Sequence, residues 1–265
     1  MNSHRCQHGL ITLDHGLKLP NCLELLLILP IASEEFTKQT ALTRFNIASH
    51  TGEHQQVVDL SRHYLKKNLQ QNIVFMDQTH GTNILTLDQI SAYNDLSADG
   101  IVSRSPNTAC MVQTADCVPL ILYSLEAPII AAIHVGWKGL IAGIIPKALE
   151  QMRSENSCLK AFIGPAICCA HFQINIGMAS DFAARAEKLA YPKQTLCDAG
   201  RWYVDLKETV KQELNALGVM QVEKNNKCTY ESADLPSYRR AQHTGVECKS
   251  RLVSLIRFKS GEAEF

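Results

Sequence analysis

Mainly apolar runs recur along the chain and are separated by turn-forming residues. They are rich in β-branched side chains, which pack well on a pleated surface, and therefore predict strands. The runs cover residues 23–29, 72–76, 83–87, 118–123, 128–134, 159–163, 219–222 and 251–258. Several are apolar throughout, so we expect strands that are covered on both faces.

The clearest helical pattern lies in residues 205–217. Asp205 can cap the first turn, and Glu208 stands at the capping-box position. Gly218 follows the segment and can act as a left-handed stop. Apolar residues recur at the spacing of one helix face, at Leu206, Val210, Leu214 and Leu217.

Three further segments predict helices, at 55–69, 139–152 and 178–189. In the second, Pro146 must either kink the helix or mark its start. Strands and helices mix without strict βαβ alternation, and neither an internal repeat nor a linker divides the chain. We therefore expect one α/β domain over residues 1–265, with layers around a mixed sheet.

Charge and hydropathy exclude several classes of protein. Lys plus Arg and Asp plus Glu number 26 each in 265 residues, and this balance argues against nucleic-acid partners and polybasic membrane anchors. The most apolar stretch, 22–32, contains Glu24 and Pro30 and is too short to span a bilayer. It also lies too far along the chain for a secretory signal, so we expect no membrane partner.

The ten cysteines are scattered without the spacing of a disulfide framework. Because no export signal is recognised, we interpret them as reduced thiols in a cytoplasmic protein. No C-x-x-C pair occurs, which argues against a structural zinc ribbon.

His80, Cys117 and His134 each stand where a predicted strand meets a turn. They are separated by 37 and 17 residues, so only the fold could bring them together. Two imidazoles and one thiolate would leave a fourth position of a tetrahedral zinc ion open, as in catalytic sites. The alternative remains that Cys117 is a small buried apolar residue and that each histidine is simply hydrogen-bonded.

Several segments in order resemble the laccase-domain family, the YfiH-like purine nucleoside phosphorylases. The segments are "QTHG", "TADCVPLIL", "AAIHVGWKGL", "IGPAI" and "CTYES" with "SYRR", and weaker similarity in "RFNIASHTGE" and "ADGIVSRSP" extends the match over residues 44–258. The family pattern reads Q-V-H-G, T-A-D-C-L-P, A-H-A-G-W-R-G, L-G-P-A-I-G and C-T-x-x-x with S-Y-R-R.

The resemblance implies a zinc enzyme with a layered α/β sandwich fold and a mixed β-sheet core. The family's metal ligands fall on His80, Cys117 and His134, which would also be the catalytic residues. Family members are described as purine nucleoside phosphorylases that also deaminate adenosine, and phosphorolysis of methylthioadenosine belongs to the same expectation. The implied partners are purine nucleosides and phosphate; copper could substitute for zinc, and a homodimer is left open.

Substrate contacts are expected among polar residues of the matched motifs. Cationic side chains suit phosphate because they donate charge-assisted hydrogen bonds, although surface ion pairs are the alternative for each. Asp116 could orient a ligand imidazole or be an ordinary turn cap, and Tyr238 could stack on a base or simply pack. The candidates for phosphate or substrate binding are Arg239, Arg240, Lys138, Arg251, Asn46 and His50.

The chain departs from the family pattern at four places. The family's Gly-rich N-terminal segment with its S-T-R is not recognisable in residues 8–21. Lys138 replaces the usual arginine and loses its bidentate fork. Five residues separate Gly245 from Arg251, whereas the family has T-G-R without a break, and Gln173 stands where glutamate is common. These differences leave the three metal ligands intact and bear on substrate choice.

Three other functions remain open. A copper polyphenol oxidase needs a trinuclear cluster fed by H-x-H pairs, and the ten histidines form none. A cysteine hydrolase or amidase that edits peptidoglycan precursors would use Cys117 as its nucleophile and a histidine as base. A nucleoside or zinc sensor would bind its ligand without turnover.

Overall fold

The apolar strands are buried on both faces, and alternate residues of one strand belong to different layers of the molecule. In β3 (Leu23–Ile28), Leu25 packs between two large sheets, whereas Leu26 packs beneath helices. β8 (Val118–Ser124) shows the same alternation. The runs are largely apolar because neither face of these strands meets water.

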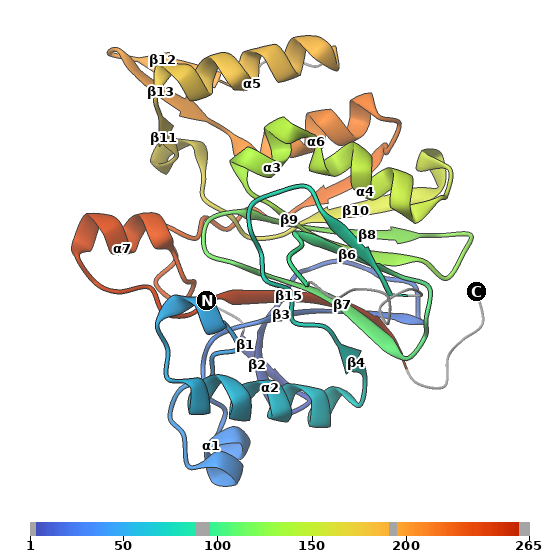
Figure 1. Ribbon diagram of the computed structural model, residues 1–265, viewed down its shortest axis with the longest axis vertical. Coiled ribbons are helices and arrows are strands. Elements are labelled where there is room, and N and C mark those ends of the chain that lie inside the picture. The colour runs from blue at the N-terminus through green and yellow to red at the C-terminus, as the bar shows by residue number, and fades with distance from the viewer. Residues whose placement is uncertain (1–3, 88–95, 191–194, 260–265) are drawn as a thin grey trace.

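The computed structural model describes residues 4–87, 96–190 and 195–259, and its centre is two six-stranded sheets packed face to face (Figure 1). Each sheet is mixed, because β4–β7 pair in parallel in the first and β10–β14 and β5–β6 in the second, among antiparallel neighbours. The first sheet has the order β1 (His4–Gln7), β2 (Leu10–Leu13), β3, β15 (Leu252–Phe258), β7 (Thr108–Thr114), β4 (Asn72–Ile73). The second has the order β14 (Gln221–Lys224), β10 (Leu159–Ile163), β8, β9 (Ile130–Val135), β6 (Gly100–Ser103), β5 (Ile84–Thr86).

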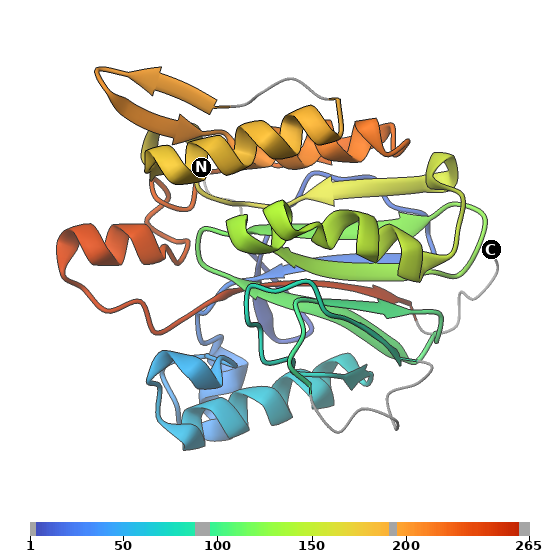
Figure 2. The ribbon, with the colours of Figure 1, turned by 45° about the horizontal axis from the view of Figure 1, so that its top comes forward.

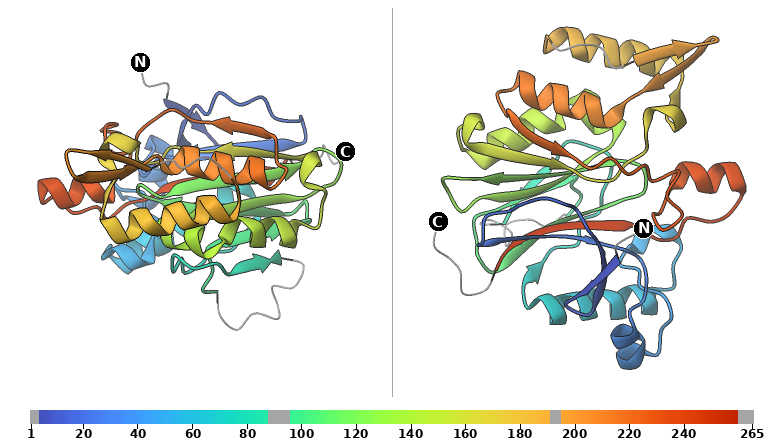
Figure 3. Two further views of the ribbon diagram at one scale, coloured as in Figure 1. Left: turned by 90° about the horizontal axis from the view of Figure 1, so that it is seen from above. Right: turned by 180° about the vertical axis from the view of Figure 1, so that it is seen from behind.

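Helices cover the outer face of each sheet (Figure 2). The first sheet is covered by α1 (Glu34–Thr40) and α2 (Gln55–Leu69). The second is covered by α3 (Trp137–Ala142), α4 (Ile144–Met152) and α6 (Leu206–Ala216), and α5 (Ile176–Lys188) packs against α3 in a further layer. A small sheet of β11 (Gln173–Ile174), β13 (Arg201–Val204) and β12 (Thr195–Asp198) lies beside α5, and α7 (Tyr238–Thr244) projects at one end of the sandwich (Figure 3).

The predicted fold class is confirmed, since the structure is a layered α/β sandwich with mixed sheets. α6 follows its sequence signals closely. The Asp205 side chain accepts a hydrogen bond from the Glu208 amide at 2.9 Å, and Gly218 has a φ of +91° just after the helix. The predicted helices at 55–69 and 178–189 are also present, as α2 and α5.

The segment 139–152 is two helices rather than one. The break falls at Gly143, which has a φ of +93°, a left-handed conformation that glycine adopts without a Cβ clash. Pro146 lies in the first turn of α4, where its missing N–H breaks no helical hydrogen bond. The proline therefore marks the start of the second helix and the glycine ends the first.

Other predicted boundaries were wrong or incomplete. The strand expected at 219–222 lies at 221–224, and the run 72–76 contributes only two strand residues. β6 and β7 were not predicted, although β7 is a fully buried strand between β15 and β4. The Thr and Gln residues of β7 interrupt the apolar run that would have predicted a buried strand. No helix in the described ranges is long and apolar enough to cross a membrane.

The connections between the two sheets decide where functional groups can meet. The chain passes from β4 in the first sheet to β5 in the second, and again from β7 to β8. His80 lies on the first of these connections and Cys117 on the second. The C-terminal end of β9 reaches the same region with His134.

A candidate metal site and its cavity

The three side chains predicted to bind metal converge. The ligand atoms of His80, Cys117 and His134 all lie within 4.8 Å of one another. The two imidazole rings are 4.7 Å apart between centroids and nearly perpendicular, at 82°. His134 is buried, Cys117 is half-buried and His80 is exposed, so the group opens to solvent on the His80 side.

One buried carboxylate orients both histidines. Asp99 is completely buried, and its Oδ1 accepts hydrogen bonds from His134 Nδ1 and the His80 amide, both at 2.8 Å. Its Oδ2 accepts from the amide and hydroxyl of Thr79 at 3.2 and 3.1 Å and from the Gly81 amide at 2.6 Å. Since Nδ1 of His134 is engaged, Nε2 is left as its ligand atom.

The same carboxylate stabilises an unusual backbone. His80 has a φ of +61°, a left-handed conformation that costs a non-glycine residue energy. The main-chain amides of Thr79, His80 and Gly81 in this turn all donate hydrogen bonds to Asp99. These three hydrogen bonds offset the conformational cost at His80. Burial alone would raise the pKa of Asp99, but the hydrogen bonds from His134 and the turn amides outweigh it and lower that pKa.

Asp116 does not orient a ligand, contrary to the prediction. Its carboxylate accepts hydrogen bonds from the Thr229 hydroxyl at 2.6 Å and the Arg239 amide at 2.7 Å. Asp99 has the orienting position instead and was missed. The available signal was its place in the family-like segment "ADGIVSRSP", immediately before β6.

Two glycines beside Trp137 let the loops approach closely. A Cβ at Gly136 would lie 2.8 Å from Cδ2 of His80 and 3.4 Å from the Cys117 sulfur. A Cβ at Gly139 would lie 2.6 Å from the main-chain oxygen of Gly81, which cannot swing away as a side chain can. The glycines flanking the tryptophan therefore make room for the His80 turn.

Cys117 and His134 perturb each other's ionisation. Burial raises the pKa of Cys117, but the charge of His134 and hydrogen bonds from His134 and His80 lower it more, to about 6. Burial lowers the pKa of His134, but the Cys117 charge and the Asp99 hydrogen bond raise it more, to about 9. Near neutral pH the pair is therefore a thiolate and an imidazolium.

The three side chains line a cavity of about 440 Å³, a volume typical of small-molecule sites. Its apolar wall includes Trp137, Ile167 and Phe172. Its polar lining is His50, Gln78, Gln113, Asp116, Tyr238, Arg239, Gln242 and Arg251. The cavity therefore combines an apolar wall, two guanidinium groups and a potential metal centre.

Two of the four cationic candidates for substrate binding line this cavity, and the other two do not. Arg239 and Arg251 line this cavity. Arg239 donates from Nη1 and Nη2 to the carbonyls of His171 and Gln173 at 3.0 and 3.3 Å. Arg240 is not a lining residue of this cavity, and its Nη1 donates to the carbonyls of Thr229, Tyr230 and Ser232 at 2.8–3.0 Å. Lys138 is exposed on α3, with its Nζ 5.8 Å from the centre of the Trp137 ring.

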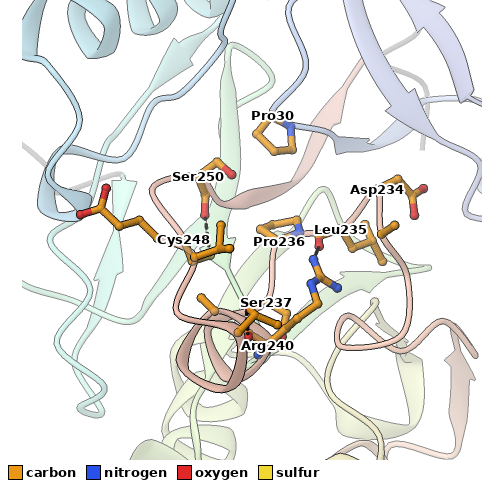
Figure 4. A pocket seen from close by; sticks show the side chains of 13 residues that line it. Pro30, Asp234, Leu235, Pro236, Ser237, Arg240, Cys248 and Ser250 are labelled. Carbon is orange, nitrogen blue, oxygen red and sulfur yellow. Dashed lines mark hydrogen bonds between the residues drawn. The ribbon is translucent and has the colours of Figure 1, made fainter.

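Arg240 faces a second hollow of about 390 Å³ on another side of α7 (Figure 4). Its Nη2 donates there to the carbonyl of Leu235, and Figure 4 shows the guanidinium pointing toward the loop that contains Leu235. Asn46 does not line the metal-group cavity either: its side-chain nitrogen donates to the Lys249 carbonyl at 2.7 Å and its side-chain oxygen accepts from the Ala48 amide. The side chains of Arg240 and Asn46 therefore hold loops in place through hydrogen bonds to main-chain groups.

Arg251 reaches the cavity despite the five residues that separate it from Gly245. Gly245 ends α7 with a φ of +71°, and the chain then turns back toward β15. Nη1 of Arg251 donates to the carbonyls of Cys248 and Ser250 at 3.0 and 2.8 Å, which holds the side chain at the start of the strand. Within the described ranges, its Nε and Nη2 have no hydrogen-bond partner.

Comparison with known proteins gives consistent matches. Residues 34–258 match the family model described as "Multi-copper polyphenol oxidoreductase laccase". A Haemophilus influenzae protein named purine nucleoside phosphorylase is 32% identical over 220 residues, covering 81% of this chain and 87% of that protein. An Escherichia coli protein named purine nucleoside phosphorylase YfiH is 30% identical over 203 residues, covering 76% and 82%.

Two solved structures share the fold. A Neisseria meningitidis protein superposes with a TM-score of 0.79 at 23% identity, covering 95% of this chain and all of that one. YlmD from Geobacillus stearothermophilus superposes with a TM-score of 0.78 at 20% identity, covering 98% and all of that chain. At these identities the superpositions establish the architecture alone.

Proposed function

Because this chain belongs to the multi-copper polyphenol oxidoreductase laccase family, whose relatives here are named purine nucleoside phosphorylases, we propose that it is a zinc-dependent purine nucleoside phosphorylase. The observation that carries the proposal is the meeting of His80, Cys117 and His134 at a cavity that also contains two arginines. Deamination of adenosine and phosphorolysis of methylthioadenosine are proposed as further reactions of the same site.

The donor set fits zinc. Thiolate and imidazole are zinc's usual protein ligands, and three of them leave a position open, as in catalytic sites. The Asp99 hydrogen bond to Nδ1 of His134 is the outer contact that zinc-binding histidines commonly make. When bound, zinc would supply Lewis acidity at the cavity wall. Copper could occupy the same ligands, but without H-x-H pairs the chain lacks a trinuclear cluster for oxygen reduction.

The cavity lining suits a nucleoside and a phosphate. Trp137 and Phe172 provide aromatic surface for a purine. Gln113 also lines the cavity and is 4% exposed, and its side-chain amide group could form a hydrogen bond with the base. Guanidinium groups bind phosphate oxygens through paired, charge-assisted hydrogen bonds.

Phosphorolysis requires these groups to hold two reactants in line. A phosphate oxygen forms a bond to the ribose C1′ as the bond from C1′ to the purine nitrogen breaks. The electron pair leaves with the purine, which takes up a proton. Arg239 and Arg251 would bind the attacking phosphate, and the apolar wall and Gln113 would bind the departing base.

Product analysis tests the assignment. The metal-replete protein is incubated with inosine or adenosine, with and without phosphate, and the products are separated by chromatography. We expect a free base and ribose 1-phosphate only when phosphate is present, and inosine from adenosine if deamination also occurs. No product from either nucleoside would refute the proposed function.

Arg251 is the arginine whose loss should most affect phosphate. Arg251→Met keeps the aliphatic stem and removes the guanidinium, and a charged hydrogen bond is worth about 1.5–3 kcal/mol. We therefore expect the KM for phosphate to rise roughly 10–100-fold, with a much smaller change in the KM for nucleoside. Lys138→Met is the matched control, because that cation lies outside the cavity. An unchanged phosphate KM in Arg251→Met would remove this residue from the phosphate site.

Zinc binding at this site should become stronger as pH rises. Cys117, with a pKa of about 6, is already a thiolate near pH 7, whereas His134, with a pKa of about 9, is protonated and must lose its proton to bind metal. Between these two values one proton should leave the pair per zinc bound, so the affinity should rise about tenfold per pH unit. Calorimetry in buffers of different protonation enthalpy measures the proton count. An affinity independent of pH across this window would contradict the ligand assignment.

One observation also favours a cysteine hydrolase as the second candidate. The thiolate of Cys117 beside the imidazolium of His134 is the arrangement of a cysteine nucleophile and its acid–base partner. In that function the thiol would react with substrate, and no stoichiometric zinc would be bound. Metal content and thiol reactivity separate the two functions.

A further inference from the structure

Four potential metal ligands meet at a second place, behind the wall of the cavity. The ligand atoms of Cys168, His171, Cys228 and Glu231 all lie within 4.8 Å of one another. The Cys168 sulfur is 3.1 Å from Nδ1 of His171 and 3.7 Å from Oε1 of Glu231. Nδ1 of His171 and Oε1 of Glu231 are 3.4 Å apart.

The spacing of these residues is regular in the sequence. The first pair has two residues between Cys168 and His171, and the second has two between Cys228 and Glu231. Short paired spacings are typical of structural zinc sites, where two loops each supply two ligands. A search for C-x-x-C pairs misses this group, because each pair has only one cysteine.

Main-chain contacts bring the two loops together without a metal. Ala166 and Cys228 form an isolated β-bridge, and the Thr229 amide donates to the Ala166 carbonyl at 3.2 Å. The Cys168 amide donates to the Cys228 sulfur at 3.3 Å. The ring of His171 stacks on Tyr230 at 4.1 Å between centroids, which fixes the imidazole orientation.

We propose that Cys168, His171, Cys228 and Glu231 bind a second zinc ion with a structural role. Two thiolates, an imidazole and a carboxylate complete a tetrahedral set from protein alone, whereas the first group provides three ligands. Two ionised thiols and a carboxylate this close together repel one another. A bound divalent cation would attract all three groups and so offset that repulsion.

The position of the site explains what the ion would stabilise. Ile167 and Phe172, which flank the first ligand pair, line the cavity. Arg239 donates through Nη1 to the His171 carbonyl at 3.0 Å, so the backbone at a zinc ligand also holds a cavity arginine. Zinc would therefore clamp the loop between Ile167 and Phe172, which forms part of the cavity wall, to the loop that contains Cys228 and Glu231.

Metal counting on the full-length protein tests the proposal, and the count does not depend on which reaction the enzyme performs. After zinc loading in reducing buffer and desalting, we expect two zinc ions per wild-type chain by elemental analysis. Cys117→Ala and Cys168→Ser should each retain one ion, and the double variant should retain none. Cys169→Ser removes a neighbouring thiol outside both groups and should retain two.

Cobalt(II) loading identifies the ligands directly. The Cys117→Ala protein should show thiolate-to-cobalt charge transfer and tetrahedral d–d bands that disappear on adding Cys168→Ser. Cys228 is buried, so its replacement would risk unfolding the protein. The second probe is therefore Glu231→Ala, because the Glu231 side chain is 59% exposed. Its zinc affinity at this site, measured by chelator competition in the Cys117→Ala background, should fall at least about tenfold.

Two results would overturn the proposal. One is a Cys117→Ala chain that is folded and fully reduced yet retains no zinc and gives no cobalt spectrum. The other is a Cys168–Cys228 disulfide, identified by mass spectrometry, that forms in wild-type protein in the presence of saturating zinc. Either result leaves the nucleoside assay unaffected, so it is distinguishable from failure of the proposed function.

Discussion

Replacing Cys117 with alanine is expected to abolish phosphorolysis and to remove the zinc ion shared with His80 and His134. The Cys117 thiolate, with a pKa of about 6, would be the one anionic ligand of this group, and two imidazoles alone hold zinc weakly. In the proposed mechanism, loss of the ion would remove a positive charge that stabilises the transition state. Turnover and metal content of the purified variant are the two measurements.

The control for this change is Cys158→Ala, which removes a half-buried thiol outside both ligand groups. It should retain full metal content and activity. Cys117→Ala protein that turns over nucleoside at the wild-type rate without this metal would refute the zinc mechanism.

Thiol labelling of the wild type separates zinc enzyme from cysteine hydrolase. A zinc-bound Cys117 should resist alkylation until a chelator is added. A nucleophilic Cys117 should be labelled rapidly without chelator, in a protein that lacks zinc at this group.

Asp99→Asn should produce the second-largest effect, although Asp99 itself is no ligand. An amide cannot accept hydrogen bonds at both ends, so its NH₂ group would face either the His134 and His80 donors or those of Thr79 and Gly81. Loss of such an outer partner typically lowers metal affinity roughly 10–100-fold. Burying an unmatched donor should also lower the free energy of unfolding by about 1–3 kcal/mol.

Zinc affinity by chelator competition and unfolding by denaturant measure the two consequences. Asp181→Asn on the exposed face of α5 removes the same charge without touching the site and should change neither. If Asp99→Asn binds zinc as tightly as the wild type, the orienting role of Asp99 is wrong.

Local sequence patterns were sufficient for much of the architecture. The apolar runs predicted β3, β8, β9, β10 and β15 because a strand covered on both faces can be apolar at every position. Asp205 and Gly218 predicted the ends of α6 because capping depends on neighbouring residues alone. β7 was missed because its burial comes from distant strands and not from its own composition.

The sequence alone also identified His80, Cys117 and His134 as a potential group, since residue type and motif order carry that information. It could not decide which polar residues accompany them. Asp116 and Asp99 both stand next to a matched strand, and only the folded chain pairs Asp116 with Thr229, 113 residues away, and Asp99 with His134. The tertiary structure likewise turned Arg251 toward the cavity and Arg240 toward backbone carbonyls, and joined Cys168 to Cys228. For Asp99, Asp116 and Cys168 the partner of the side chain is far away in the sequence, and strand pairing and sheet packing in the folded chain bring the two together.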